Sequence, residues 1–118
     1  MKTTPALLKK YLASTITEAE KVVAKFDQRS KENRSYALAW ADAYFQAVAV
    51  LHIHGDVAMK LEQGAEIDEI KKLVIDRAVQ GAAMHGQSTS VCATYLNQCE
   101  TRAWAQLADF ILRYGAEL

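Results

Sequence analysis

The residues of this chain whose types suit metal binding begin with its histidines. His52 and His54 are two positions apart, and on a helix such residues point in nearly opposite directions, so one ion cannot bind both. His52 and Asp56, four apart, can share an ion, but two ligands do not make a zinc site. We therefore predict no metal site. We expect His54 at the edge of the core and His52 at a surface or an interface.

A second candidate for chemistry is His85, which precedes three hydroxyl residues, Ser88, Thr89 and Ser90. A histidine close to a hydroxyl is the pattern of a base beside a nucleophile. No carboxylate stands nearby in the sequence to orient the imidazole. Ser and Thr are also preferred N-cap residues, so we interpret this segment as the turn before a helix.

The two cysteines, Cys92 and Cys99, lack basic neighbours that would activate a thiolate. Seven residues on a helix separate them by about 10 Å, which is beyond disulfide reach. We predict inert core thiols, no catalytic residue and no cofactor. Reduced thiols and the lack of a signal-peptide pattern predict a cytoplasmic protein.

The elements that must position these residues are long helices, because the chain has one proline and five glycines. Apolar residues recur at steps of three and four, with Thr4 and Ser35 as expected caps and Gly64 as an expected helix end. The predicted helices span residues 5–27, 35–63, 66–85 and about 89–114. The predicted fold is all-α: one domain, residues 1–118, forming an up-and-down four-helix bundle with a long central second helix.

Each predicted helix has an inward face. In the second helix this face continues through Gly55, which we expect to be tolerated because a neighbouring helix crosses close by; the alternative is a hinge recapped by Asp56. The expected core face of the second helix contains Tyr36, Trp40, Tyr44, Ala47, Leu51 and Ala58. The expected inward residues of the fourth helix are Cys92, Leu96, Cys99, Ala103, Leu107, Phe110 and Tyr114.

Charge is missing from two stretches, residues 35–55 and 78–99, which together contain only Asp42 although the chain has 14 basic and 14 acidic residues. In an up-and-down bundle these stretches fall at the same end. The outer face of the second helix is apolar there, and soluble monomers seldom expose such a patch. We predict an interaction surface that contains Leu38, Phe45, Ala49, His52 and Ile53. The alternative is a second helix wrapped on all sides by the others.

These features predict a small non-catalytic module, an adaptor, inhibitor or regulator, that forms a homodimer through this apolar surface. A net charge of zero argues against nucleic-acid binding, and an alanine-rich second helix that carries Asp42 argues against a membrane span. A weak helix-turn-helix pattern covers residues 80–96, but no Arg or Lys follows until Arg102, so a DNA-binding regulator is the least favoured function.

An alternative function comes from a resemblance in bundle size and expected dimerisation to the HEPN ribonucleases, which carry an Arg and a His four to six residues apart. Here Arg77 and His85 have seven residues between them, with Gly81 among these, so the chain departs from that motif. This resemblance implies a ribonuclease acting at a dimer cleft, where Arg77 and His85 of two chains converge.

Overall fold

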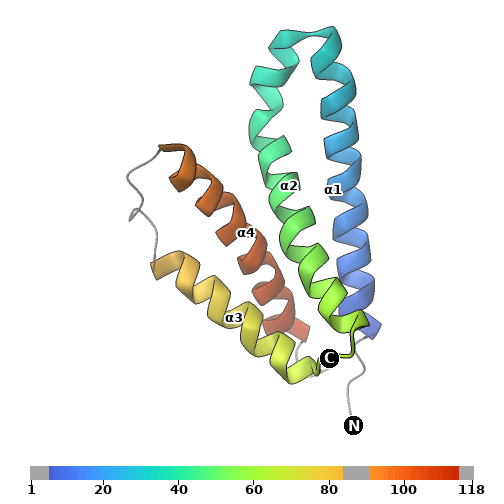
Figure 1. Ribbon diagram of the computed structural model, residues 1–118, viewed down its shortest axis with the longest axis vertical. Coiled ribbons are helices and arrows are strands. Elements are labelled where there is room, and N and C mark those ends of the chain that lie inside the picture. Colours follow the sequence, from blue (N-terminus) through green and yellow to red (C-terminus); the bar gives the residue numbers. More distant parts are fainter. Residues whose placement is uncertain (1–5, 84–90, 115–118) are drawn as a thin grey trace.

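The computed structural model describes residues 6–83 and 91–114, with side chains described for residues 6–81 and 95–114. This part of the chain consists of four helices joined in up-and-down order, which confirms the predicted all-α four-helix bundle (Figure 1). The helices are α1 (Ala6–Glu32), α2 (Arg34–Glu62), α3 (Ile67–Ala83) and α4 (Val91–Tyr114). None of these described helices has the length and apolar character needed to cross a lipid bilayer.

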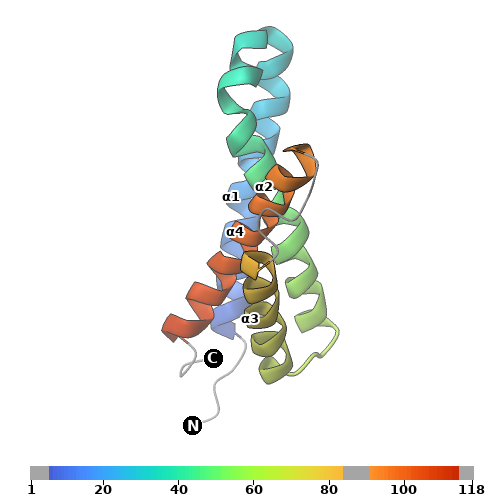
Figure 2. The same ribbon diagram turned by 90° about the vertical axis from the view of Figure 1, so that its left-hand side faces the viewer.

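The second helix is central because it packs against α1 on one side and α4 on another. α1 and α2 form a long hairpin, and the shorter hairpin of α3 and α4 lies against α2 beyond its first two turns, with contacts to α4 that include Asp42 (Figures 1 and 2). The turn between α1 and α2 therefore stands clear of the other two helices, at the top of Figure 1. The larger part of α2 is covered on two sides, and its first two turns are covered mainly by α1.

The turn between α1 and α2 is tighter than predicted. α1 continues to Glu32 rather than residue 27, and Asn33 alone separates it from α2. Asn33 has an extended backbone (φ −147°, ψ 112°), and its side-chain Oδ1 accepts a hydrogen bond of 2.9 Å from the backbone N–H of Ser35. The predicted cap, Ser35, was therefore wrong: Asn33 satisfies a free N–H of the first turn.

The other end of α2 confirms the predicted role of Gly64. This residue has φ +90°, a conformation that favours glycine, directly after the C-cap Gln63. The N–H of Gly64 donates to the carbonyl of Leu61 (3.1 Å), and the N–H of Ala65 donates to that of Lys60 (3.0 Å). These two bonds form a Schellman motif, which satisfies the last carbonyls of α2.

Two glycines inside helices have different surroundings. α2 continues through Gly55 as predicted, but the expected close helix crossing there was wrong, because a Cβ at this position would meet nothing within 4 Å. The close crossing occurs at Gly81 in α3, where a Cβ would lie 2.5 Å from Oγ1 of Thr101 in α4. Gly81 therefore allows α3 and α4 to approach each other.

The core lies where α2 faces both α1 and the shorter hairpin. Of the inward residues predicted for α4, Cys99, Ala103 and Leu107 are buried as expected. Leu96 and Tyr114 are exposed, which corrects the prediction, while the side chain of Cys92 lies outside the described residues. The largest fully buried side chains are Leu8, Leu12, His54, Val57, Ile70, Val74, Cys99 and Leu107.

Candidate association surface

The structure divides the five predicted interaction residues into two groups. Leu38 is 86% exposed, Phe45 is 39% exposed, and His52 is also exposed. Ala49 and Ile53 are only 6% and 2% exposed, because this chain itself covers them. The second group therefore offers no surface to a partner, which corrects the prediction for these two residues.

The position of α4 explains why part of the predicted surface is buried. Gln46 Nε2 donates a 3.0 Å hydrogen bond to the carbonyl of Cys99, and His54 Nε2 donates one of 3.2 Å to that of Ala103. These bonds hold α4 on the side of α2 that includes Ile53. α2 thus has two buried sides rather than one. The apolar periodicity of the sequence predicted a single inward face, so it did not separate the side that packs on α1 from the side that packs on α4.

A third side of α2 is left uncovered by the described residues. Five exposed side chains of this side follow one another at steps of seven, three, four and seven residues. A helix turns by 100° per residue, so the five positions fall within an arc of about 80° around the α2 axis. We call this set the α2 seam; it comprises Leu38, Phe45, Val48, His52 and Met59. The sequence reasoning missed Val48, which is 40% exposed, and Met59, which is 58% exposed. Continuing the seven-residue steps from Leu38 and Phe45 finds Met59.

Phe45, at the middle of the seam, is held by aromatic neighbours. Its ring packs edge-on against Tyr44 of the same helix (centroids 5.5 Å apart) and against Tyr95 of α4 (5.8 Å). The Tyr44 ring in turn stacks on Phe26 of α1 at 4.4 Å. Edge-on and stacked pairs are the favoured aromatic arrangements, so the exposed part of Phe45 is presented in one orientation.

Tyr95 is itself fixed by Asp42. The phenol O–H of Tyr95 donates a hydrogen bond to a carboxylate oxygen of Asp42. This bond raises the pKa of Tyr95, because deprotonation would remove it and place a phenolate beside a carboxylate. The one charged residue between positions 35 and 55 is therefore used inside the chain, to join α2 to α4.

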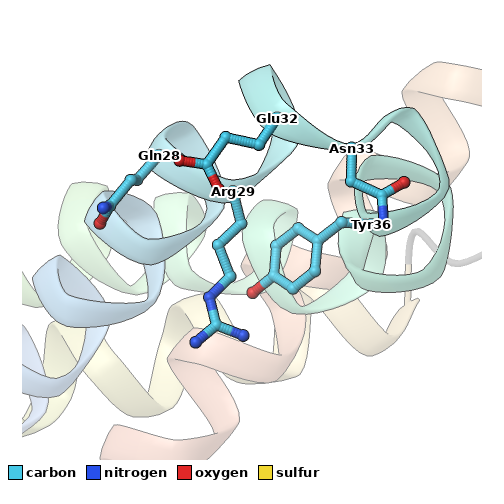
Figure 3. A pocket seen from close by; sticks show the side chains of 5 residues that line it. All are labelled: Gln28, Arg29, Glu32, Asn33 and Tyr36. Carbon is cyan, nitrogen blue, oxygen red and sulfur yellow. The ribbon is translucent and has the colours of Figure 1, made fainter.

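A shallow hollow of about 440 Å³ lies beside the turn between α1 and α2 (Figure 3). In Figure 3 the guanidinium of Arg29 lies beside the ring of Tyr36, with its Cζ 5.9 Å from the ring centroid. Gln28, Glu32 and Asn33 complete the lining. Arg29, Glu32 and Asn33 are exposed, so the hollow is an open, solvated feature of the turn and we assign it no ligand.

The candidates for chemistry that the structure describes, His52, His54 and Arg77, do not assemble into a site. His54 is fully buried with both ring nitrogens hydrogen-bonded, and His52 Nε2 lies 3.7 Å from Asp56 at the surface. In the described part of the chain no three potential ligands approach closely enough to hold a metal ion. Arg77 is exposed on α3. His85 and the three hydroxyl residues that follow it lie outside the described residues.

Comparisons of the chain with protein-family models, with curated proteins and with solved structures give no match.

Proposed function

We propose that this protein is a non-catalytic helical association module, an adaptor, inhibitor or regulator, whose working form is a homodimer joined through the α2 seam. One observation carries the proposal: large apolar side chains remain exposed along one side of a helix that packs against α1 and α4 on other sides. Contiguous exposed apolar surface on a helix is typical of a docking face. We also propose a cytoplasmic location, which the free buried thiol of Cys99 supports.

The size of the seam is compatible with a dimer that depends on concentration. Complete burial of a large apolar side chain contributes roughly 1.5–3 kcal/mol, and Leu38, Phe45, Val48 and Met59 count twice in a symmetric contact. Because Phe45 and Val48 are already more than half buried, the gross gain is on the order of 10 kcal/mol. Association itself costs about 4–15 kcal/mol. The fixed orientation of Phe45 lowers this cost.

The test is the mass of the protein in solution, measured by sedimentation over a range of concentrations. One chain has a mass of 13.1 kDa, and we expect a species of twice this mass at the higher concentrations. Phe45→Glu and Leu38→Glu are expected to give monomers, because each places a charge in an apolar contact. A matched control is Leu112→Glu. Leu112 is an apolar residue of α4 that is more exposed than Phe45, so the same kind of substitution there should leave the dimer intact.

The unfolding of each variant is followed by circular dichroism, so that loss of the dimer is not confused with loss of the fold. A wild-type protein that stays monomeric at high concentration would contradict the proposal. So would folded seam variants that keep the wild-type mass.

A further inference from the structure

The α2 seam has charges of opposite sign beyond its apolar centre. Arg34 begins α2, and Asp56 lies near the other end of the seam; both are exposed. Each stands eleven residues from Phe45, one before it and one after it. Eleven residues turn the helix by about 20° more than three full turns, so both charged residues lie on the same face as Phe45. Each lies about 16 Å from Phe45 along the helix axis.

The placement of Arg34 and Asp56 about Phe45 makes the two ends of the seam complementary in charge in one orientation. When two copies of α2 lie antiparallel with a two-fold axis at Phe45, residues equally distant from Phe45 on either side face each other. Arg34 of each copy then faces Asp56 of the other, and Leu38 faces His52. In a parallel pair, by contrast, Arg34 would face Arg34 and Asp56 would face Asp56, and like charges repel.

We infer that the partner of the α2 seam is a second copy of this chain, docked antiparallel along α2 with the two-fold axis at Phe45 and with Arg34–Asp56 pairs at both ends. This inference depends on the proposed function, since it assigns a partner and an orientation to the same surface. A two-fold contact of this kind is closed, because each copy uses the same patch and no part of the seam is left for a third copy.

Charge reversal tests the orientation. Arg34→Glu and Asp56→Arg each turn two attractive pairs into two repulsive ones, so each is expected to raise the dimer dissociation constant by about tenfold. The double variant Arg34→Glu/Asp56→Arg restores opposite charges and should return to within about threefold of the wild type. Lys60→Glu is the matched control, because this exposed residue of α2 lies outside the seam and should have little effect.

Disulfide crosslinking gives a second readout. Leu38→Cys alone is expected not to link two chains, whereas a mixture of Leu38→Cys and His52→Cys chains should form a disulfide between these two positions under oxidation. Peptide mapping separates this bond from any bond made by the native cysteines. Efficient linking of Leu38→Cys to itself would overturn the antiparallel arrangement.

The two proposals fail in different ways. If Phe45→Glu abolishes the dimer while the single charge reversals leave its dissociation constant unchanged, the seam is the interface and the antiparallel orientation is wrong. If the wild type is monomeric, or Phe45→Glu has no effect on its mass, the proposed function fails and the orientation fails with it.

Discussion

The imidazole Nδ1 of His54 in α2 lies 2.6 Å from the hydroxyl Oγ1 of Thr15 in α1. This hydrogen bond joins the two helices. The opposite ring nitrogen, Nε2, lies 3.2 Å from the carbonyl oxygen of Ala103 in α4. A carbonyl only accepts, so in neutral His54 the proton is on Nε2 and Nδ1 is an acceptor. The Thr15 hydroxyl, which also lies 3.1 Å from the carbonyl oxygen of Leu12, donates its one proton over the shorter distance to Nδ1. One imidazole thus joins the three helices α1, α2 and α4, and its two hydrogen bonds explain why this polar group is stable although it is fully buried.

We predict that the free energy of unfolding falls as the pH drops below about 6.5, the ordinary pKa of histidine. Burial lowers the pKa of folded His54, with partial opposition from the bond to Ala103. Unfolded His54 therefore binds a proton at a higher pH than folded His54, so acid favours the unfolded chain. Urea unfolding between pH 5 and 7.5 measures the slope.

The matching variants are His54→Gln and His52→Gln. His54→Gln should remove the contribution of His54 to the slope of the unfolding free energy with pH. His52→Gln changes an exposed histidine two residues away and should leave that contribution in place. An equal slope in wild type and His54→Gln would contradict the assignment.

The hydroxyl of Thr15 can be tested alone with Thr15→Val, which keeps the shape of the side chain. Nδ1 of His54 would then lose its partner in a buried site, and a buried unsatisfied group costs about 1–3 kcal/mol of stability. Thr17→Val changes an exposed threonine of the same helix and should have a much smaller effect. Chemical denaturation of both variants makes the comparison.

The two helical glycines should respond to alanine with opposite signs. Gly55→Ala should stabilise the protein by about 0.5–1 kcal/mol, since its Cβ meets nothing and alanine is the better helix former. Gly81→Ala should cost about 1–3 kcal/mol, because its Cβ would overlap Thr101. Melting temperatures give both signs, and adding Thr101→Ala to Gly81→Ala should recover part of the loss.

The cap of α2 gives a third pair of variants. Asn33→Ala removes the acceptor for the N–H of Ser35 and should cost about 1 kcal/mol of stability. Ser35→Ala keeps the backbone N–H, so it should cost clearly less. The reverse order in a denaturation experiment would mean that Ser35, as the sequence predicted, caps the helix.

The phenol of Tyr95 should ionise at a higher pH than an ordinary tyrosine, because its hydrogen bond to Asp42 raises its pKa. Asp42→Asn removes the negative charge and should bring the ionisation back toward the ordinary range. Ultraviolet absorbance titration follows the phenolates, and a Tyr95→Phe variant identifies the contribution of this residue. Identical curves for the wild type and Asp42→Asn would contradict the contact.

Helix existence followed from the sequence because the apolar steps of three and four and the sparse breakers are local features. Gly64 was placed correctly for the same reason, since an αL helix end strongly favours glycine. The cap was placed two residues too late, because Asn33 and Ser35 are both good caps and only the length of α1 decides between them.

The exposure of the five predicted interaction residues was foreseen only in part. Leu38, Phe45 and His52 are exposed, whereas Ala49 and Ile53 are buried within the chain. Periodicity says which residues share a face, but it does not say how many neighbours a helix has. Met59 could have been found by continuing the seven-residue steps from Leu38 and Phe45, whereas the exposure of Val48 became visible only in the tertiary structure.

The sequence by itself determined that this protein is a set of four long helices with an apolar, charge-poor second helix, because helix propensity, apolar spacing and charge are properties of neighbouring residues. The tertiary structure alone decided which sides of that helix are covered. That choice depends on contacts between residues far apart in the chain, such as Thr15, His54 and Ala103, whose pairing leaves no mark in local sequence.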